Sequence, residues 1–389
     1  MLQKVLFVHD GPLLGNKDQS VYYGVHYNDE IIERYSFFGS TVSFLMRFQG
    51  INEKEAINYT KINHPAFNFI EIPNFKSIKT FYKKSKAIKI IKDAVDQHDV
   101  IILRLPSASG TIAFEYAKSI NKPILIEMVA CVYDALWNYD WRGKLLAKYK
   151  MRKYQSILQK ASHVIYVTNE FLQMRYPTKG KSIGCSDVVL KGIDHAVLDK
   201  RLKKIENLQE ELVLGTVAAI DVPYKGQADV IKVIEKCIGA EKKCKYKIVG
   251  QGNPMRLRGI VEKNHLQSSV DIIGSLSHNK VFEFIDEIDL YVQPSKQEGL
   301  PRSVIEAMSR ACPVIGTNIA GIPELISRDA LFEAGNEDEI AALIEQLNPE
   351  KMKAWAIENF EMAKKFQKES LDTHRKSFYN TFKKDFDLH

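Results

Sequence analysis

Two glutamates lie eight residues apart in the segment QEGLPRSVIEAM, and their spacing could serve chemistry on a phosphorylated ligand. Glu298 falls in the turn before Pro301, and Glu306 falls on the helix expected after it. Proline suits a first helical turn because its missing N–H would have no partner there. The free amides of Arg302 and Ser303 at that helix start favour an anion such as phosphate. The segment therefore predicts an anion site with a carboxylate on either side.

A carboxylate one turn inside the helix can accept two hydrogen bonds from a vicinal diol such as ribose, each contributing about 1.5–3 kcal/mol. We therefore expect Glu306 to hold a ribose, the helix start with Arg302 to hold a diphosphate, and Glu298 to hold a sugar. The alternative is an exposed charge ladder, because Arg302, Glu306 and Arg310 are each four residues apart. Pairs in such a ladder contribute only a few tenths of a kcal/mol.

Lys225 follows an apolar stretch in the segment VAAIDVPYKGQ, which allows it to reach the same site. A lysine there can neutralise a diphosphate as a point charge, and the alternative is a solvated loop lysine. Gly250 and Gly252 in IVGQGN supply two glycines of a dinucleotide-binding fingerprint without the third. That pair by itself does not identify a nucleotide site.

Strands that end in small or polar residues are expected to position these groups in the second half of the chain. The predicted strands are Val213–Val217, Tyr246–Val249, Asp271–Ile273, Leu290–Gln293 and Val314–Gly316. In an open parallel sheet, ligands bind outside the carboxyl ends of the strands. Five such ends in succession predict one polar crevice.

The first half alternates strands and helices in the same way. The predicted strands are Val5–His9, Ser40–Arg47, Val100–Leu103, Ile124–Glu127, Val164–Thr168 and Asp187–Leu190, and the predicted helices are Tyr27–Tyr35, Lys83–Gln97, Thr111–Ser119 and Leu145–Gln159. This alternation predicts an α/β protein with two parallel-sheet domains, which a length of 389 residues also favours. We expect a first domain over 1–192, a polar linker over 193–210, a second domain over 211–355, and a C-terminal helix over 356–389 that crosses back.

Composition places the chain among globular proteins, with 45% apolar and 26% charged residues. It has no apolar run long enough to span a bilayer, and MLQKVLFVHDG resembles a buried strand rather than a signal peptide. Five cysteines without a Cys-x-x-Cys pair are expected to be reduced. We therefore expect a cytoplasmic protein.

Positive charge is concentrated in the first half, where residues 1–200 hold 28 Lys and Arg against 19 Asp and Glu. This surplus predicts an anionic partner, either phosphates, anionic lipid or nucleic acid, or else a solvated basic face. The segment Lys76–Lys92 is basic with interleaved aromatic and apolar residues. It is either a peripheral contact with anionic membrane at the inner face of a plasma membrane or an ordinary solvated helix face.

The segment EGLPRSVIEAMSRACPVIGTNIAGIPELI resembles the Glu-x7-Glu region of family-4 retaining glycosyltransferases. YKGQ, KIVGQGNP and VDIIGSLSHNKVFEFIDEIDLYVQPS match that family in order over residues 211–330, and RLPSASG, KPILIEMVACVYDALWN and VIYVTNEFLQMRYPTKG are similar to members acting on cell-surface polysaccharides. The resemblance implies the GT-B fold, in which two Rossmann-like domains face each other across a cleft. It also implies a nucleotide-sugar donor, UDP- or GDP-linked, with no metal and no cofactor.

The resemblance assigns roles to individual residues. Lys225 and Arg302 would stabilise the leaving diphosphate and Glu298 would position the sugar, which makes these three the expected catalytic residues. The donor-binding residues it implies are Glu306, Gly299, Leu300, Ser303, Gly250, Gly274 and Leu276, with Gly274 and Leu276 against the base.

The chain departs from the family pattern in three places. Ile220 stands where members often have an arginine, so we expect Arg302 to supply that charge. The glycine pair after the first strand is replaced by the single glycines Gly11 and Gly15, and a histidine expected after Ile124–Glu127 is missing. The acceptor-side candidates are therefore Gly15, Glu127, Asp134 and Arg104.

The sequence thus predicts a retaining, metal-independent glycosyltransferase that moves a hexose-type sugar from a nucleotide-sugar to a glycan or lipid-linked glycan. Capsule, O-antigen or exopolysaccharide synthesis is the expected setting, with no nucleic-acid partner. Two alternatives remain open: a nucleotide-sugar 2-epimerase of the same fold, and a non-catalytic nucleotide-sugar-binding protein.

Overall fold

The N-terminal half is built on one mostly parallel sheet. The structure is a computed structural model that describes residues 3–24, 27–57, 59–239, 241 and 243–388. Its parallel strands run in the order β5-β3-β1-β6-β7-β8-β9, and β2 and β4 extend one end of β1 in antiparallel fashion. The strands are β1 (Lys4–Gly15), β2 (Tyr22–Gly24), β3 (Thr41–Gly50), β4 (Thr60–Lys61), β5 (Phe67–Glu71), β6 (Val100–Leu105), β7 (Ile124–Met128), β8 (His163–Tyr166) and β9 (Lys181–Gly184).

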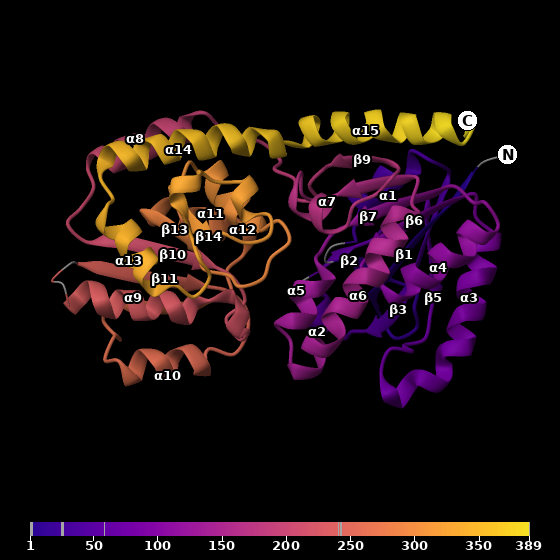
Figure 1. Ribbon diagram of the computed structural model, residues 1–389, viewed down its shortest axis with the longest axis horizontal. Helices are drawn as coiled ribbons and strands as arrows, with labels where there is room; N and C mark the ends of the chain where they lie inside the picture. Colours follow the sequence, from indigo (N-terminus) through magenta and orange to yellow (C-terminus); the bar gives the residue numbers. More distant parts are fainter. Residues whose placement is uncertain (1–2, 25–26, 58, 240, 242, 389) are drawn as a thin grey trace.

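Helices cover both faces of this sheet (Figure 1). Apolar side chains of α3, α4 and α6 pack on one face, and those of α1 and the C-terminal helix α15 pack on the other. The strands between them are buried on both sides, which explains why they read as continuous apolar runs. The helices of this half are α1 (Asp29–Ser36), α2 (Glu53–Ala56), α3 (Lys84–Asp96), α4 (Ala108–Ser119), α5 (Val132–Trp137), α6 (Trp141–Gln159) and α7 (Phe171–Arg175), with the 3-10 helix η1 (Ile78–Lys83) before α3.

The C-terminal half repeats this plan on a second, fully parallel sheet in the order β12-β11-β10-β13-β14-β15. Its strands are β10 (Leu212–Val217), β11 (Cys244–Val249), β12 (Val270–Gly274), β13 (Leu290–Gln293), β14 (Val314–Thr317) and β15 (Leu331–Phe332). Its helices are α8 (Ala196–Glu206), α9 (Gln227–Gly239), α10 (Met255–Lys263), α11 (His278–Glu287), α12 (Arg302–Ser309), α13 (Glu337–Glu345) and α14 (Pro349–Ala363), with the 3-10 helices η2 (Pro223–Lys225), η3 (Ile322–Glu324) and η4 (Arg328–Ala330).

The C-terminal segment joins the two halves. Helix α14 packs against α8 and α12, and α15 (Lys368–Asp385) continues across to the N-terminal sheet, as Figure 1 shows. At the crossing the 3-10 helix η5 (Lys364–Phe366) interrupts the helix, and the amide of Leu190 donates to the carbonyl of Phe366 at 2.8 Å. The crossing helix that we predicted is confirmed, although it is two helices rather than one.

The predicted α/β architecture with two parallel-sheet domains is confirmed, and one strand prediction is wrong. Asp187–Leu190 forms no strand; Leu190 makes an isolated bridge to Gln367, and Asp187 turns toward two arginines. The stretch that we predicted as a linker contains α8, where Arg201 is buried and donates to the carbonyl of Ile288 at 2.6 Å. No helix among the described residues is long and apolar enough to cross a membrane.

Candidate active site

Glu298 is held in the loop after β13 by three donors to one carboxylate oxygen. Its Oε1 accepts from Lys225 Nζ at 2.6 Å, from Ser295 Oγ at 2.7 Å and from Gln293 Nε2 at 2.9 Å. The side chains of Lys225 and Glu298 are both largely buried. The charges of this lysine and this glutamate therefore neutralise each other in the structure.

The backbone fixes Lys225 in this position. It ends the 3-10 helix η2 that follows β10, and Gly226 after it has a φ of +75°. A Cβ on Gly226 would lie 1.9 Å from the carbonyl oxygen of Pro294, so both the conformation and the space require glycine. The loop after β10 is thus clamped against the loop that carries Glu298.

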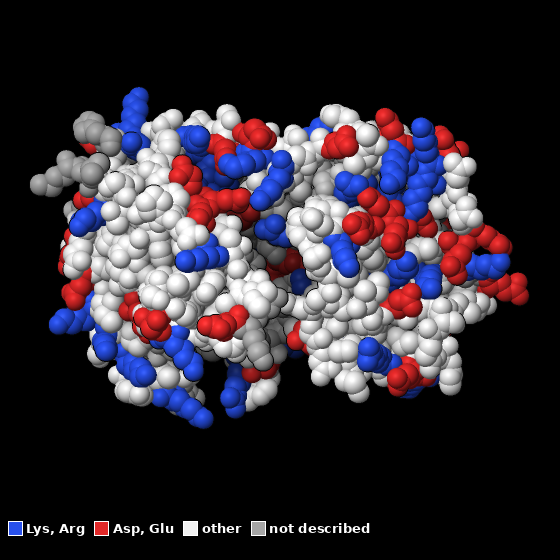
Figure 2. Space-filling model, turned by 180° about the vertical axis from the view of Figure 1, so that it is seen from behind, with Lys and Arg blue, Asp and Glu red and all other residues white. Residues whose placement is uncertain are grey.

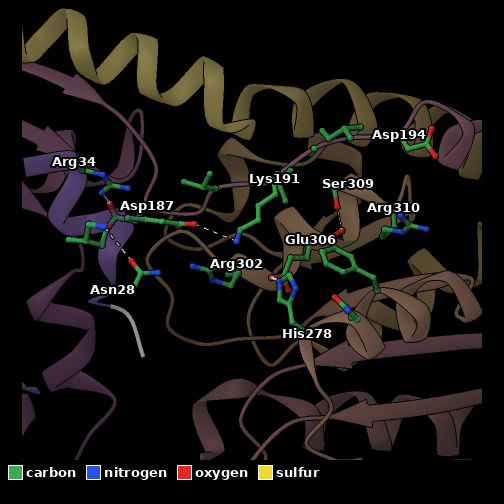
Figure 3. Close-up of a pocket in the computed structure, with 18 of the residues that line it drawn as sticks. Asn28, Arg34, Asp187, Lys191, Asp194, His278, Arg302, Glu306, Ser309 and Arg310 are labelled. Carbon is green, nitrogen blue, oxygen red and sulfur yellow. Dashed lines mark hydrogen bonds and ion pairs between the residues drawn. The ribbon is translucent and has the colours of Figure 1, made fainter. Parts of the chain in front are cut away.

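Glu306 lies in the second turn of α12 and is buried, at 5% exposure. Its Oε1 is 3.3 Å from Nε2 of His278, the first residue of α11 (Figure 3). Burial raises the pKa of Glu306 above its ordinary value of 4.5, while Arg302 and His278 oppose that rise. A carboxylate whose charged form is destabilised by burial is a feature of ligand sites.

Glu306 faces a cavity of about 830 Å³ between the two halves of the molecule. The C-terminal half contributes His278, Asn279, Phe282, Arg302, Glu306, Ser309 and Arg310, and the N-terminal half contributes residues of α1, Arg104 and the segment 187–194. Of the residues predicted from the sequence, Arg302, Glu306 and Arg104 line this cavity. Glu298 and Lys225 do not line it, although we expected one continuous crevice.

Arg302 differs from the other basic side chains that line the cavity. Among the described residues, Arg302 forms no ion pair, and it is exposed. The others have acidic partners: Arg34 and Arg104 with Asp187, Lys191 with Glu30, Arg310 with Asp286, and His278 with Glu306. Arg302 at the start of α12 is therefore the cation available to an anion in the cavity.

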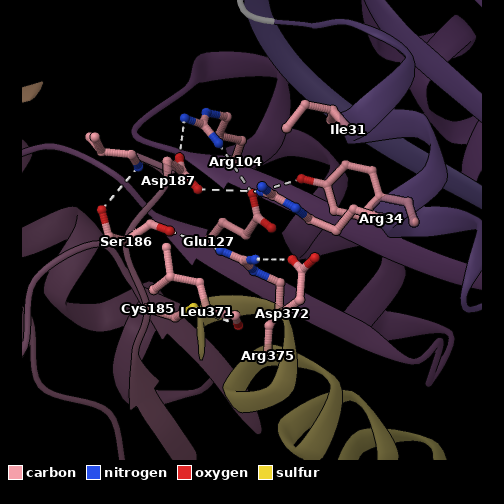
Figure 4. Close-up of polar contacts among 12 residues, drawn as sticks. Ile31, Arg34, Arg104, Glu127, Cys185, Ser186, Asp187, Leu371, Asp372 and Arg375 are labelled. Carbon is pink, nitrogen blue, oxygen red and sulfur yellow. Dashed lines mark hydrogen bonds and ion pairs between the residues drawn. The ribbon is translucent and has the colours of Figure 1, made fainter. Parts of the chain in front are cut away.

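The N-terminal wall of the cavity is an ionic network centred on Arg104 (Figure 4). Arg104 donates to Asp187 Oδ2 at 2.5 Å and to Glu127 Oε2 at 3.3 Å. Glu127 also accepts from the hydroxyl of Tyr35 at 2.8 Å, and Arg34 lies 3.5 Å from Asp187. The neighbouring arginines hold the pKa of Asp187 below its usual range even though burial opposes them.

The C-terminal helix α15 supports this network from behind. Arg375 is buried, and its guanidinium donates to the carbonyl of Ser186 at 2.8 Å and pairs with Asp372 at 3.4 Å. The segment that carries Asp187 is therefore fixed by a helix from the far end of the chain.

Two of the four predicted acceptor-side residues, Glu127 and Arg104, come together in this network. Gly15 lies in the hairpin between β1 and β2, where a Cβ would approach the ring of Phe48 at 2.7 Å. Asp134 lies on α5, 3.8 Å from Arg175. Neither Gly15 nor Asp134 lines the cavity.

The predicted glycines of the donor side are constrained in different ways, Gly250 and Gly299 by space and Gly274 by its backbone conformation. A Cβ on Gly250 would lie 1.8 Å from the carbonyl oxygen of Ala218, and one on Gly299 would lie 3.1 Å from that of Val129 in the N-terminal half. Gly274 has a φ of +87°. Gly250 therefore has a packing reason to be glycine, and Gly299 lets the two halves approach each other.

The remaining predicted donor residues lie in the loops after β12 and β13 and at the start of α12. Leu276 and Leu300 pack partly buried against the core of the C-terminal half, and Ser303 Oγ lies 3.4 Å from Gln293 Oε1. Through Gln293, the start of α12 is therefore linked to the contacts that hold Glu298.

Loops of the two halves meet beside the cavity. The carboxylate of Glu324 in η3 accepts the backbone amides of Asn169, Glu170 and Phe171 at 2.5, 3.2 and 2.7 Å. Asn138 Nδ2 donates to the carbonyl of Lys296 at 3.4 Å. These contacts hold the loops after β8 and β7 against the loops after β14 and β13.

Sequence reasoning missed four residues of this region: His278, Asp187, Arg34 and Glu324. His278 begins a helix directly after a strand end, in GSLSHNK, which was a usable signal. Asp187 precedes Val-Val-Leu, an apolar run that favours a strand, and Arg34 reads as an ordinary charged residue of an amphipathic helix. Nothing in the sequence pairs Glu324 with amides more than 150 positions away.

No group of acidic, histidine and cysteine side chains suited to a metal occurs among the described residues. Asp385, the last residue of α15, has partners within the protein. Asp385 pairs with Lys181 at 2.6 Å and with His163 at 2.9 Å, on the side of the N-terminal half.

Comparisons with known proteins match both the sequence and the fold. Residues 199–368 match the family model described as glycosyl transferases group 1. Over 386 residues the chain is 26% identical to Protein CapJ of Staphylococcus aureus, covering 98% of this chain and 96% of CapJ. Over 113 residues it is 28% identical to the amylovoran biosynthesis glycosyltransferase AmsK of Erwinia amylovora, covering 26% of this chain and 28% of AmsK.

Among solved structures, HepE of Anabaena in complex with UDP and glucose superposes with a TM-score of 0.65 at 16% identity, covering 97% of this chain and 99% of HepE. At that identity the likeness concerns the fold, which is two parallel-sheet domains across a cleft. The family match lies on the half that carries Glu298, Arg302 and Glu306. Residues 199–368 thus match the group 1 glycosyltransferases, and the whole chain has the two-domain GT-B fold of its structural neighbours.

Proposed function

We propose that the chain is a retaining glycosyltransferase that moves a hexose-type sugar from a nucleotide-sugar donor to a glycan or lipid-linked glycan acceptor in cell-surface polysaccharide synthesis. The observation that carries the proposal is one cavity wall on which the buried carboxylate of Glu306 lies one turn from Arg302, a cation with no ion pair among the described residues. The UDP and glucose bound by HepE and the amylovoran role in the name of AmsK support the donor class and the setting.

In this proposal the C-terminal half, about residues 211–355, binds the donor, and the N-terminal half, about residues 1–192, binds the acceptor. Glu306 accepts hydrogen bonds from the ribose, and Arg302 with the amides at the start of α12 binds the diphosphate. The further donor contacts are Gly299, Leu300, Ser303, Gly250, Gly274 and Leu276, and the acceptor contacts are Arg104, Glu127, Asp134 and Gly15.

Lys225 and Glu298 exchange partners when the donor binds. In the structure they neutralise each other across 2.6 Å. A diphosphate beside Lys225 supplies a new counter-charge, so the carboxylate of Glu298 is released to accept hydrogen bonds from the sugar hydroxyls. Ser295 and Gln293, which also donate to Glu298, keep that carboxylate aimed at the site.

The difficult step is the separation of a sugar oxocarbenium from the diphosphate. Lys225, Arg302 and the amides of α12 stabilise the charge that develops on the leaving oxygen. The bond from the anomeric carbon to the phosphate oxygen breaks, and the acceptor hydroxyl attacks from the same face and passes its proton to that phosphate oxygen. The configuration is retained, and neither a metal nor a second catalytic carboxylate takes part.

A thermal-stability screen with UDP-, GDP- and dTDP-sugars tests the donor class, because a saturating ligand stabilises a protein by several kcal/mol. The nucleotide-sugar that stabilises the protein should then support transfer to a glycan acceptor in excess EDTA, with the anomeric configuration retained by NMR. Formation of a C2 epimer without any acceptor would assign an epimerase instead. Binding without turnover on any acceptor would assign a non-catalytic binding protein, and a strict need for Mg²⁺ or Mn²⁺ would overturn the mechanism.

A further inference from the structure

An unusual number of large apolar side chains are exposed along α5 and the first turns of α6. Their exposed fractions are 41% for Trp137, 83% for Tyr139, 67% for Trp141, 73% for Leu145, 49% for Leu146 and 64% for Tyr149. Trp141, Leu145 and Tyr149 are four residues apart and so form one stripe on the helix. Contiguous exposed apolar patches on soluble proteins mark surfaces that bind a partner.

A second exposed aromatic pair lies across a groove from the middle of α6. Phe81 and Tyr82 at the end of η1 are exposed, and helices α3, α4 and α6 lie side by side on one face of the N-terminal sheet (Figure 1). A groove of about 340 Å³ joins the two regions, with Phe81 and Lys84 on one side and Lys150 and Lys153 on the other. We call the combined surface of segments 76–92 and 137–153 the basic-aromatic face.

The basic-aromatic face is strongly positive. Segment 76–92 contains seven lysines and no acidic residue, and segment 137–153 contains six basic residues and one acidic residue. That residue, Asp140, caps α6 by accepting the amide of Gly143 at 2.6 Å. The excess of basic over acidic residues in these segments exceeds the net charge of +7 of the whole chain. Seen from behind, Lys and Arg gather along the lower edge of the N-terminal half (Figure 2).

Several of these charges have no acidic partner among the described residues. Within the part of the chain that the structure describes, Lys84, Lys150 and Lys153 form no ion pair. Burial and the neighbouring Lys153 lower the pKa of Lys150. Cations that repel each other beside a groove favour an anionic partner over open solvent.

We propose that the basic-aromatic face docks on the surface of an anionic lipid bilayer. Trp and Tyr suit the boundary between headgroups and acyl chains because one end of each ring system is polar and the rest is apolar. Leu145 and Leu146 add aliphatic side chains that can enter the acyl region, and lysines around them meet the headgroup charge. Nucleic acid would gain nothing from these leucines, since its bases bind by stacking on aromatic rings. A second copy of the same face would bring like charges together.

The proposal does not depend on the proposed reaction, because binding to a bilayer is measured without turnover. If the acceptor is lipid-linked, docking through the N-terminal half leaves the C-terminal half accessible to a donor from solution. Loss of transfer with intact vesicle binding would therefore count against the reaction and leave the docking surface standing.

Vesicle co-sedimentation tests the proposal with phosphatidylcholine alone and with equal parts of phosphatidylcholine and phosphatidylglycerol. We expect binding to the anionic vesicles only, weakened by salt. Tryptophan emission should shift to the blue on binding, because Trp137 and Trp141 are exposed while the remaining tryptophan, Trp355, is buried. The change Trp141→Phe should remove much of that shift.

Two sets of variants separate the contribution of the lysines from that of the apolar side chains that enter the bilayer. Replacing Lys84, Lys150 and Lys153 with glutamine should weaken partitioning about fivefold per lysine, or about 100-fold together. Replacing Trp141, Leu145 and Tyr149 with serine should abolish the emission shift. The matched controls are Lys200, Lys203 and Lys263 changed to glutamine and Met255 and Ile357 changed to serine, all exposed in the C-terminal half. Each variant should keep the melting temperature of the unaltered protein.

Three results would overturn the proposal. Binding that ignores lipid charge, or that both variant sets leave unchanged, would assign the vesicle contact to another surface. Binding of a labelled RNA oligonucleotide that the same lysine changes abolish, without vesicle binding, would assign the face to nucleic acid. A dimer in sedimentation that the serine changes convert to a monomer would make the face an interface between copies.

Discussion

The two walls of the cavity handle charge in opposite ways. On the N-terminal wall Arg34 and Arg104 are compensated by Asp187 and Glu127 within an ionic network that α15 supports. On the C-terminal wall Arg302 has no ion pair among the described residues, and burial raises the pKa of Glu306. A wall with spare charge suits a ligand that brings its own anion, such as a nucleoside diphosphate. A compensated wall suits a neutral acceptor that is recognised by shape and hydrogen bonds.

The largest expected effect is on the stability of the protein. A matched pair of arginine substitutions, one on each wall, should lose very different amounts of it. Arg104→Met removes a largely buried cation, so that Glu127 loses its ion pair and Asp187 keeps only the longer one to Arg34, and we expect a loss of about 3–5 kcal/mol. Arg302→Met alters an exposed side chain and should cost less than about 0.5 kcal/mol. Thermal denaturation of both variants provides the measurement. Equal losses of stability would break the contrast between the walls.

The next effect concerns the rate of transfer. Lys225→Ala should lower kcat by about 10²- to 10³-fold, because the lysine stabilises charge on the leaving diphosphate. The change also leaves the carboxylate of Glu298 with only Ser295 and Gln293 as donors, so a moderate loss of stability is expected beside it. Steady-state kinetics at a temperature well below the melting point isolates the rate. Turnover close to that of the unaltered enzyme would exclude the phosphate role of Lys225.

A third prediction compares the two glutamates that the C-terminal half contributes to the proposed site. Glu306→Gln should weaken binding of the free nucleoside diphosphate by about 1–3 kcal/mol, or roughly 5- to 150-fold, because hydrogen bonds to a charged acceptor are lost. Glu298→Gln should lower kcat instead. It should leave diphosphate affinity unchanged or improved, because it frees Lys225 from its counter-ion. Calorimetry of both variants decides, and equal losses of diphosphate affinity would contradict the division between ribose and sugar.

Much of the C-terminal half could be predicted from the sequence because its site residues lie close to one another along the chain. Strands such as Leu290–Gln293 are buried on both sides and read as apolar runs, and each is followed at once by the loop that carries a site residue. Glu298, Arg302 and Glu306 share one strand–loop–helix unit, so their spacing in sequence fixes their spacing in space. Five strand predictions in this half correspond to observed strands for the same reason.

The N-terminal wall could not be predicted in the same way because its contacts are long-range. Arg104 meets Asp187 across 83 positions, and Arg375 reaches Ser186 across 189. No periodic pattern records such pairings. The apolar run after Asp187 favoured a strand, whereas the ionic network fixes that segment in an irregular path. The approach of Gly299 to Val129, which belongs to the other half of the molecule, is likewise a long-range contact.

The smallest expected effect is the pH dependence that Glu306 gives to nucleoside diphosphate binding at the C-terminal wall. Because burial raises its pKa, Glu306 takes up a proton at a higher pH than an ordinary glutamate does, and a protonated carboxyl accepts hydrogen bonds poorly. Affinity for the nucleoside diphosphate should therefore be constant at neutral pH and fall as the solution is made mildly acidic. The phosphate groups of the ligand also titrate in that range, and His278 lies beside Glu306 in both proteins. The quantity to measure is therefore the difference in diphosphate affinity between the unaltered protein and Glu306→Gln, because those groups are common to both.

The difference in diphosphate affinity between the two proteins should shrink toward acidic pH. The difference in stability between them should shrink as well, but it has the opposite sign. A carboxyl whose pKa is higher in the folded than in the unfolded protein contributes stability below the unfolded value and loses it as pH rises through the folded one. At neutral pH, without ligand, Glu306→Gln should therefore melt slightly above the unaltered protein, and this advantage should vanish on acidification. Diphosphate affinities that run parallel for the two proteins across the range, with no difference in melting temperature at neutral pH, would show that Glu306 carries no functional charge. The comparison between the walls would then depend on Arg302 alone.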